Sequence, residues 1–551
     1  MSAHLEKRPQ VGLAIRLPLA RPEVSPEALL AAICLYFVVA CNVTFWQSVA
    51  GHQASPGLIA SLAVAVFALH ALLIGSIAVG RATQPVLAGL LLVTAFATYY
   101  MTRYAVLFDV EMIHNVLKTD LAESRELVSV GMVLHVLVYG VVPAALVCWL
   151  RIAPRSIRAG AARRSIFLGA MAALAVIALV ISSQGIFALM RNDHALRYQI
   201  TPGNYIVSLV RALTEQGDVA PSARLKVAED AHIPASQQVR KPRLLVLVVG
   251  ETARAQNWGL NGYHRQTTPA LAGRDVINFS EVQACGTSTE VSLPCMFSVF
   301  GRSNYDKHAI RDHESLLDVL ARAGVSVQWR DNQSGCKGVC DGVGIERMDA
   351  AIDPGRCANG RCMDDILLTG LASRIEATKG DLAVVLHQLG NHGPNYFERY
   401  PAQYETYTPT CRTPELSRCT GEQIVNAYDN AITYTDAFLS RALDIVQQQT
   451  SHEGAFLYVS DHGESLGEYG LYLHGAPYAI APQQQLHVPM VMWLSPELAS
   501  DTGIDVPCLR AGASRARSHD NLFHSVLGLF GVQTHAYESG KDIFAPCQIK
   551  A

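Results

Sequence analysis

The sequence predicts a chain in two parts: an α-helical membrane domain with five transmembrane helices, followed by an exported α/β/α domain. Five uncharged apolar runs occupy the first third, short apolar runs alternate with helical patterns after residue 242, and ten of the 13 cysteines fall in this second part. Half of the 551 residues are hydrophobic and only 17% are charged, which excludes a disordered or fibrous chain. The net charge of −3 gives no indication of a nucleic-acid partner.

The five apolar runs are each 18 to 26 residues long, enough for a helix to cross about 30 Å of hydrocarbon. Buried helices of a soluble core could resemble one such run, but five in succession favour a membrane domain. The first run is too long for the apolar part of a signal peptide and lacks a small-residue cleavage site, so we expect it to remain in the protein. The runs are Ala28–Phe45, Leu58–Gly80, Ala82–Thr102, Leu127–Leu150 and Ser165–Met190.

The charges of the connecting segments predict a cytoplasmic N-terminus. Arg151–Arg164 contains five arginines and no acidic residue, and the N-terminal segment and the short connection at Arg81 are also basic. Five spans put these three segments on one side, where the positive-inside rule places them in the cytoplasm. The acidic segment Arg103–Glu126 and everything after Met190 then lie outside the cytoplasm.

The exported cysteines occur in close pairs, as is typical of disulfides in an oxidising compartment. Cys508 and Cys547 remain and are left to pair with each other. A zinc ribbon is disfavoured because no pair has the C-x-x-C spacing. The close pairs are Cys285/Cys295, Cys336/Cys340, Cys357/Cys362 and Cys411/Cys419.

Composition divides the chain into a transmembrane domain (residues 1–200), a bridging helix and linker (residues 201–241), and a catalytic domain (residues 242–551). We expect an amphipathic helix at Tyr205–Leu213, on the membrane surface. In the last part, alternating strands and helices predict an open, mainly parallel sheet between helical layers. The strands expected are Leu244–Val249, Leu382–Leu386, Ala455–Val459 and Val488–Trp493, and the helices are Glu314–Ala323 and Ala427–Gln448.

Polar side chains follow three of these strands. Glu251 follows the first strand, Asp461 and His462 follow the third, and His387 and His392 follow the second. Ligands of open α/β sheets gather beyond the carboxyl ends of the strands, so these residues can converge although they are far apart in sequence. Two carboxylates and an imidazole suit a divalent cation, with zinc favoured over manganese.

A loop rich in hydroxyl groups offers a nucleophile for such a metal. Thr287, Ser288, Thr289 and Ser292 lie between Cys285 and Cys295. A hydroxyl bound to zinc loses its proton readily and becomes nucleophilic near neutral pH. The pattern does not choose among the four hydroxyls, and the same cluster is typical of a helix N-cap.

Several motifs together resemble those of the lipid A phosphoethanolamine transferases, the family that includes the mobile colistin-resistance enzymes. They occur in the family's order, and with five N-terminal spans the resemblance covers nearly the whole chain. They are Val249–Arg254, Asn261–Tyr263, Thr268–Pro269, Cys285–Cys295, Trp329–Asn332, Lys337–Gly338, His387–Pro394, Tyr428–Asn430, Tyr434–Asp436, Ser460–Ser465, His474–Pro477 and Val488–Met490.

The resemblance implies an alkaline-phosphatase-like fold for the exported domain. It implies that one tightly bound zinc, with a second left open, is held by Glu251, Thr289, Asp461 and His462, and that Thr289 is also the nucleophile. It further implies that three histidines surround the transferred group while a lysine adds positive charge: His387, His392, His474 and Lys337.

A polar stripe in the membrane half also matches the family pattern. Asn115, Thr119 and Glu123 are spaced i, i+4 and i+8, so one continuous helix would align them. The spacing alone fits a solvated helix face, but the resemblance implies that they hold the headgroup of the lipid donor. Two residues depart from the family: Glu290 stands where alanine is expected, and Gln333, a candidate substrate-binding residue, stands where relatives often have asparagine.

The function implied is transfer of phosphoethanolamine from phosphatidylethanolamine to a phosphate of lipid A through a covalent phospho-threonine, which lowers surface negative charge and gives polymyxin or colistin resistance. We expect a monomer in the bacterial inner membrane with a periplasmic catalytic domain. The alternatives are transfer of phosphoethanolamine or phosphoglycerol to core heptose or a periplasmic glucan, and a non-catalytic sensor of lipids or peptides. The intact ligand set argues against a sensor, and a sulfatase would need a C/S-x-P-x-R signature that does not occur.

Overall fold

A computed structural model describes residues 21–52, 54–119, 121–192, 195–216, 224–235, 240–358 and 361–549. The chain forms two compact units. One consists of the residues up to Cys41 together with Ser55–Ala95 and Val136–Ile186. The other consists of Asn42–Ala54, Phe96–His135 and the chain from Phe187 onward.

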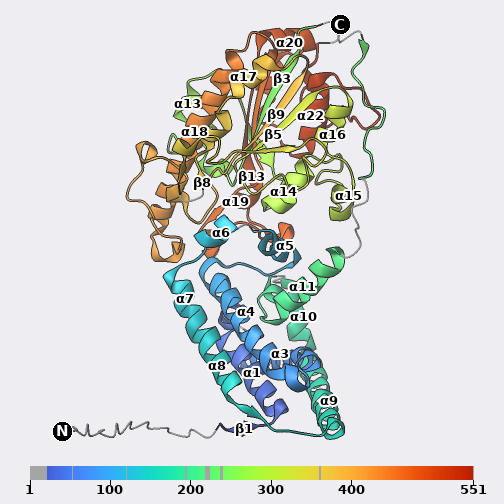
Figure 1. Cartoon of the computed structure of the whole chain (residues 1–551), viewed down its shortest axis with the longest axis vertical. Helices are drawn as coiled ribbons and strands as arrows, with labels where there is room; N and C mark the ends of the chain where they lie inside the picture. Colours follow the sequence, from blue (N-terminus) through green and yellow to red (C-terminus); the bar gives the residue numbers. More distant parts are fainter. Residues whose placement is uncertain are drawn as a thin grey trace, which may run out of the picture. The chain divides into compact units, whose positions relative to one another are not determined.

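Long apolar helices make up the first unit (Figure 1). Helix α3 (Pro56–Ile77) packs along α9 (Ile157–Ile181) and also contacts α1 (Pro26–Ala40). Each of these helices begins at a serine whose hydroxyl accepts a hydrogen bond from the first turn, which explains where they start. In the described part of the chain, four stretches are long and apolar enough to cross a membrane: Pro56–Ile77, Gly80–Tyr104, Val130–Trp149 and Ile157–Ile181.

The first predicted span is not one straight helix. Helix α1 ends at Ala40, and α2 (Val43–Gly51) continues at an angle of 51°. The break lies at Asn42, whose side-chain amide donates to the Thr201 carbonyl (2.6 Å) and accepts from the Thr201 N–H (2.9 Å). The prediction of a continuous helix over Ala28–Phe45 is therefore wrong, and the bent pair supplies a fifth span only when it is counted as one.

The remaining helices of the first half follow the predicted runs and connections. The last predicted run is divided between α9 and α10 (Ser183–Asn192). The others are α4 (Thr83–Tyr104), α5 (Val110–Lys118), α6 (Leu121–Glu126), α7 (Val130–Val136) and α8 (Val142–Trp149). The expected amphipathic helix is present as α11 (Gly203–Gln216), which packs against α5.

A sheet of eight strands, counted among the described residues, organises the second unit in the order β14-β4-β13-β10-β3-β9-β5-β6. All four predicted strands are present, and the central strands β10, β3, β9 and β5 are parallel, as expected. Only β13 runs antiparallel to its neighbours. The strands are β3 (Arg243–Gly250), β4 (Ile277–Gln283), β5 (Ser326–Asp331), β6 (Ile345–Arg347), β9 (Leu382–His387), β10 (Glu453–Ser460), β13 (His487–Leu494) and β14 (Arg517–Ser518).

Helices cover both faces of this sheet, which confirms the α/β/α fold. Figure 1 shows α17 (Leu371–Ala377) and α18 (Gly421–Gln447) on one face, and α16 (Leu316–Arg322) and α22 (Asp520–Phe530) on the other. Helix α18 begins earlier than predicted because Thr420 and Gln423 form a capping box at its start. The shorter helices are α13 (Pro269–Ala272), α14 (Thr289–Met296), α15 (Lys307–Asp312), α19 (Gln483–Leu486), α20 (Pro496–Thr502) and α21 (Val506–Ala511).

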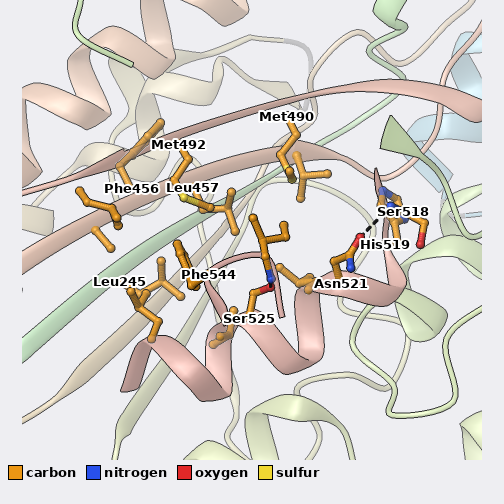
Figure 2. A pocket seen from close by; sticks show the side chains of 17 residues that line it. Leu245, Phe456, Leu457, Met490, Met492, Ser518, His519, Asn521, Ser525 and Phe544 are labelled. Atoms are coloured by element: carbon orange, nitrogen blue, oxygen red, sulfur yellow. Dashed lines mark hydrogen bonds between the residues drawn. The ribbon is translucent and has the colours of Figure 1, made fainter. Parts of the chain in front are cut away.

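The core between the sheet and α22 is densely filled. Figure 2 shows Leu245 and Leu457 of the sheet facing Ser525 of α22 and Phe544, with His519 at one end. The cavity among these residues measures about 20 Å³ and is lined almost entirely by apolar side chains. It is packing space, and the sheet can therefore hold its carboxyl edge rigidly.

Disulfides staple the loops around the sheet as predicted. All four close pairs are bonded, and Cys508 bonds Cys547. Cys34, Cys41 and Cys148 of the first half are free. The exported half therefore has the disulfide set of a protein that matures in an oxidising compartment.

Candidate metal centre

The strand register brings the predicted ligands to one edge of the sheet. Gly250 at the end of β3 is paired with Ser460 at the end of β10, so the next residues, Glu251 and Asp461, leave the sheet side by side. The Asp461 N–H donates to the Gly250 carbonyl at 2.9 Å and fixes this turn. The convergence predicted from strand ends is thus present in the fold.

Glu251, Asp461 and His462 form a compact, fully buried group. Nε2 of His462 lies 3.5 Å from a carboxylate oxygen of Glu251 and 3.5 Å from one of Asp461. One ligand atom from each residue lies within 4.8 Å of the other two, as expected when three side chains share one ion. Among the described residues, no other group of three or more His, Cys, Asp or Glu side chains meets this condition.

The chemistry of the group fits a divalent cation. Nδ1 of His462 lies 2.9 Å from the Gly463 carbonyl and donates to it, which leaves the lone pair of Nε2 for a metal. Burial lowers the pKa of His462 to about 4, so the ring is neutral at pH 7. Two buried carboxylates next to a neutral ring need a positive charge, and Oδ2 of Asp461 has no hydrogen-bond partner among the described residues.

Thr289 is the hydroxyl that the fold directs at these ligands. It is the first residue of α14, and its Oγ1 lies 2.9 Å from Oε2 of Glu251 and 3.3 Å from Nε2 of His462. The neighbouring hydroxyls of Thr287 and Ser292 instead donate to the main-chain carbonyls of Ala476 and Asp461. Of these three hydroxyls, that of Thr289 is the one that contacts side chains of the candidate ligands.

His387 is the last residue of β9 rather than part of the loop after it. Its Nδ1 lies 2.8 Å from Oδ1 of Asp331, while Nε2 is buried without a hydrogen-bond partner among the described residues. Burial tends to raise the pKa of Asp331, but the bonds from His387, Trp329 and Gly335 outweigh it and hold this pKa below its usual range. An ionised Asp331 holds the His387 ring through Nδ1 and leaves Nε2 outside this bond.

Two further histidines lie next to His462: His474 is beside its ring, and His392 is beside the ring of His474. The ring centroids of His462 and His474 are 4.5 Å apart, and those of His474 and His392 are 5.6 Å apart. Nδ1 of His474 lies 3.3 Å from the buried Glu464 carboxylate. Burial, and next the neighbouring His474, hold the pKa of His392 well below its usual range, so His392 is neutral at pH 7.

Lys337 and Gln333 form a chain that ends at the ligands. Nζ of Lys337 donates to Oγ of Ser334 (2.7 Å), the Ser334 hydroxyl and N–H donate to Gln333, and Nε2 of Gln333 donates to Oε2 of Glu251 (3.0 Å). Gln333 thus contacts a candidate ligand, whereas Lys337 is linked to it through two side chains.

The stripe predicted over Asn115, Thr119 and Glu123 is not one helix. Helix α5 ends at Lys118, and Thr119 adopts an extended conformation while its hydroxyl donates to the Asn115 carbonyl at 2.7 Å. The continuous i, i+4, i+8 alignment is therefore wrong, because the backbone turns to the extended conformation at Thr119 after its N–H has made the last helical bond to the Asn115 carbonyl. The Glu123 side chain lies outside the described residues.

Glu290 does not contact the metal ligands. Its carboxylate pairs with Lys118 of α5, and its other oxygen is buried without a hydrogen-bond partner among the described residues. The acidic residue that stands in place of the expected alanine is therefore paired with a cation, Lys118, at the end of α5.

An apolar cavity of about 320 Å³ opens beside His474. Its walls come from the chain after α4, from α5 and from the loop before β13. A methyl group added to Gly475 on this wall would lie 3.7 Å from Nδ2 of Asn115, so Asn115 is close to the cavity. The lining residues are Ala105, Val106, Leu107, Met112, Ala195, Leu471, Tyr472, His474, Gly475, Ala476, Ile480 and Gln485.

His519 was not expected from the sequence, because an isolated histidine outside any motif carries no signal. Its Nε2 donates to the Ser460 carbonyl (3.0 Å), and its Nδ1 accepts from the Cys285 N–H (3.1 Å). It therefore ties the loop before α14, which begins at Thr289, to the last residue of β10, which precedes Asp461. Asp331 was also not predicted as a site residue. It is the last residue of β5, so the rule that ligands gather at the carboxyl ends of strands would have identified it if β5 had been predicted.

The neutral His519 makes the fold sensitive to acid. Burial lowers its pKa to about 4, whereas an unfolded histidine titrates near 6.5. Between these two values the unfolded chain binds a proton that the folded chain does not, so the free energy of unfolding falls as the pH decreases from 6.5 to 4. We expect a smaller fall of the melting temperature between pH 7 and pH 5 for chelated His519→Asn than for the chelated parent. Equal falls would contradict this prediction.

Gly390 leaves room for Glu251. Its φ is +55°, and a methyl group there would lie 2.7 Å from the Glu251 carbonyl oxygen and 2.9 Å from its Cβ. We expect Gly390→Ala to displace Glu251 and to lower metal affinity and activity by about 100-fold. The control is Gly380→Ala, which also has a positive φ (+103°) but no atom within 4 Å. Equal metal affinity in the two variants, measured by competition with a chelating dye, would contradict the prediction.

Comparison with known proteins finds similar proteins over nearly the whole chain. A family model described as phosphoethanolamine transferase EptA/EptB matches residues 66–216, and a sulfatase model matches residues 243–532. Phosphoethanolamine transferase EptA of Escherichia coli K12 is 37% identical, over 96% of this chain and 98% of that protein. Phosphatidylethanolamine transferase Mcr-1 of Escherichia coli is 36% identical, over 93% and 96%.

A solved structure extends the agreement to the fold. The integral membrane protein lipooligosaccharide phosphoethanolamine transferase A (EptA) from Neisseria meningitidis matches with a TM-score of 0.92 and 36% identity, covering 96% of this chain and 100% of that one. Since identity above 30% extends over nearly the full length of both curated relatives, the chain belongs to the phosphoethanolamine transferase family.

Proposed function

We propose that this protein transfers phosphoethanolamine from phosphatidylethanolamine to a phosphate group of lipid A. The observation that carries the proposal is the position of Thr289, whose hydroxyl lies 2.9 Å from Glu251 and 3.3 Å from His462 in a buried group suited to a divalent cation. The similarity to a transferase named for lipooligosaccharide supports a glycolipid acceptor.

The cation is zinc, held by Glu251, Asp461, His462 and Thr289. Two carboxylates and one neutral imidazole are a donor set that zinc accepts, and manganese is the less favoured ion. When bound, zinc would lower the pKa of the threonine hydroxyl and polarise a phosphoryl oxygen. The proposal requires one ion and leaves a second open.

In the first step, Oγ1 of Thr289 forms a bond to the donor phosphorus, and the bond from phosphorus to the glycerol oxygen breaks. The proton of the Thr289 hydroxyl passes to Oε2 of Glu251, to which the hydroxyl donates at 2.9 Å, and the departing oxygen takes one up as diacylglycerol leaves. His474 is the candidate proton donor, because the Glu464 carboxylate 3.3 Å from its Nδ1 orients the ring and offsets its charge.

In the second step, a phosphate oxygen of lipid A attacks the phosphorus and the bond to Oγ1 of Thr289 breaks, which restores the hydroxyl. His392 and His387 flank the transferred group, and Asp331 holds the His387 ring so that its free nitrogen faces that group. The positive charge of Lys337 acts through Ser334 and Gln333.

The apolar cavity of about 320 Å³ supports a lipid donor, since its walls suit acyl chains and glycerol and His474 is one of the residues that line it. Asn115 near this cavity is a candidate for the headgroup, together with Thr119 and Glu123 from the family pattern. A catalytic domain joined in one chain to membrane-spanning helices suits a reaction in which both donor and acceptor are lipids.

The proposed location is the bacterial inner membrane, with a cytoplasmic N-terminus and a periplasmic catalytic domain. The proposed division is a transmembrane domain over residues 1–200, a bridging segment over 201–241 and a catalytic domain over 242–551. Addition of a cationic group offsets the negative charge of the lipid A phosphate, so cationic peptides such as polymyxin bind the surface more weakly and colistin resistance follows.

Mass spectrometry of lipid A tests the proposal in a susceptible Gram-negative host carrying this protein or an empty vector. The expected result is a phosphoethanolamine increment only with the protein, together with cleavage of a fluorescent phosphatidylethanolamine headgroup by purified protein that a chelator stops and zinc restores. Headgroup cleavage with unmodified lipid A would overturn the acceptor and favour core heptose or a periplasmic glucan. No cleavage in either assay would overturn the enzyme assignment in favour of a sensor.

A further inference from the structure

A carboxylate from the membrane half lies in the second unit between two arginines, of which Arg399 is buried and Arg361 is partly exposed. Glu126 is the last residue of α6, in the segment that joins α4 to α7, and its side chain is only 11% exposed. Nη1 of Arg399 donates to its Oε1 at 3.3 Å and Nη2 donates to its Oε2, while Nε of Arg361 donates to Oε1 at 3.1 Å. One carboxylate thus holds two guanidinium groups, one of them in the two-point geometry that arginine favours.

Arg399 connects Glu126 to His392, a histidine of the site. Its side chain is 1% exposed, and its remaining nitrogen, Nε, donates to the His392 carbonyl at 2.7 Å. All three guanidinium nitrogens therefore have partners, two on Glu126 and one on His392. Because the guanidinium is planar and rigid, the position of the carboxylate fixes the position of the carbonyl.

His392 is held by little else at this point. Its ring packs edge-on against His474, and its Nδ1 is buried without a hydrogen-bond partner among the described residues. Its N–H makes only a long bond of 3.4 Å to the Leu389 carbonyl. The bond from Arg399 to the carbonyl is thus the shortest contact that locates this residue.

We propose that Glu126 is a positioning residue for the transfer reaction, acting on His392 through Arg399. The expected effect on kcat rests on the proposed function. The link from Glu126 to His392 depends only on the contacts described above. The consequence is that the catalytic half depends for its geometry on the segment between α4 and α7, so the site is fully ordered only while that segment is docked.

The test uses the full-length protein and Glu126→Gln, which keeps the size of the side chain but loses the charge and one acceptor oxygen. We expect kcat to fall about 10- to 100-fold, as for a misplacement of about 1 Å at a reacting group. The KM for the donor should stay within about twofold, and zinc content should not change, because the metal ligands are untouched. Glu126→Asp should recover part of kcat.

Glu405→Gln is the matched control. Glu405 pairs with Arg412, whose side chain is 63% exposed, so the same chemical change is made at a surface ion pair of the same unit. This variant should keep the kcat of the parent. Arg399→Lys should lose as much kcat as Glu126→Gln, and the double variant should lose no more than either, since the two residues act in one chain.

Hydrogen exchange of the amides at positions 388–400 reads the position of His392 without any transfer. Faster exchange there in Glu126→Gln, together with the loss of kcat, is the expected result. Unchanged exchange with unchanged kcat would overturn the inference, and so would unchanged exchange with a lower kcat, because Glu126 would then act by another route. If the parent protein protects these amides from exchange but transfers no phosphoethanolamine, the proposed function is overturned. The comparison of amide exchange in the parent and in Glu126→Gln still tests the link from Glu126 to His392.

Discussion

Replacing Thr289 with alanine is expected to lower phosphoethanolamine transfer by about 10³-fold or more, because no other side chain can take over a covalent step. The hydroxyls of Thr287 and Ser292 donate to main-chain carbonyls, so neither faces the ligands. Thr289→Ser retains a hydroxyl at the same position and should keep part of the activity. Rates are measured by release of a labelled phosphatidylethanolamine headgroup.

The covalent intermediate gives this prediction a second readout. Parent protein incubated with donor and no acceptor should carry a phosphoethanolamine increment on the peptide that contains Thr289, and Thr289→Ala should carry none. Ser288→Ala is the matched control, because Ser288 precedes Thr289 and its side chain makes no capping bond in α14. An increment on Ser288, or full activity in Thr289→Ala, would refute the assignment of the nucleophile.

Replacing Asp461 with asparagine is expected to remove the metal and to lower activity by more than about 100-fold, which exceeds the loss usual for residues that only support a ligand. Oδ2 of Asp461 is buried without a hydrogen-bond partner among the described residues and lies 3.5 Å from Nε2 of His462. An amide nitrogen at that place cannot bind the ion. Metal content is measured by mass spectrometry after exchange into metal-free buffer.

The same substitution should affect stability with opposite signs in the two metal states. Without metal, the buried charges of Glu251 and Asp461 repel each other, so removal of one charge should raise the melting temperature of the chelated protein. With zinc present, the parent should be more stable, because only it gains the binding free energy of the ion. Asp444→Asn, at a surface pair with Arg274, should change neither value. One equivalent of zinc in Asp461→Asn would refute its role as a ligand.

Local patterns determined which residues reach the edge of the sheet. Runs of buried aliphatic residues specify β3, β9 and β10, and parallel strands end at a common edge, so Glu251, Asp461 and His387 had to emerge near one another. The paired cysteines likewise follow from spacing and compartment, because short loops close at low entropic cost. These features depend on neighbours in sequence or on the sheet as a whole.

Local patterns were wrong where a distant hydrogen bond or an extended residue ended a helix. The run Ala28–Phe45 is apolar throughout, yet the helix breaks where Asn42 pairs with Thr201. The stripe from Asn115 to Glu123 has helical spacing, yet the extended backbone of Thr119 ends α5. Periodicity reports only which face of a helix would be apolar or polar, and it does not report the partners that interrupt the helix.

The sequence by itself therefore determined the fold class, the disulfide set and the residues that could bind a metal, since these follow from hydrophobic pattern and strand ends. Spacing left four hydroxyls open, the family resemblance pointed to Thr289, and the tertiary structure placed its hydroxyl beside Glu251. Only the tertiary structure paired Asp331 with His387, His519 with the Ser460 carbonyl and Glu126 with Arg399. The physical reason is that a side chain's role depends on its direction and its partners. In a folded chain, those partners come from segments that no local pattern connects.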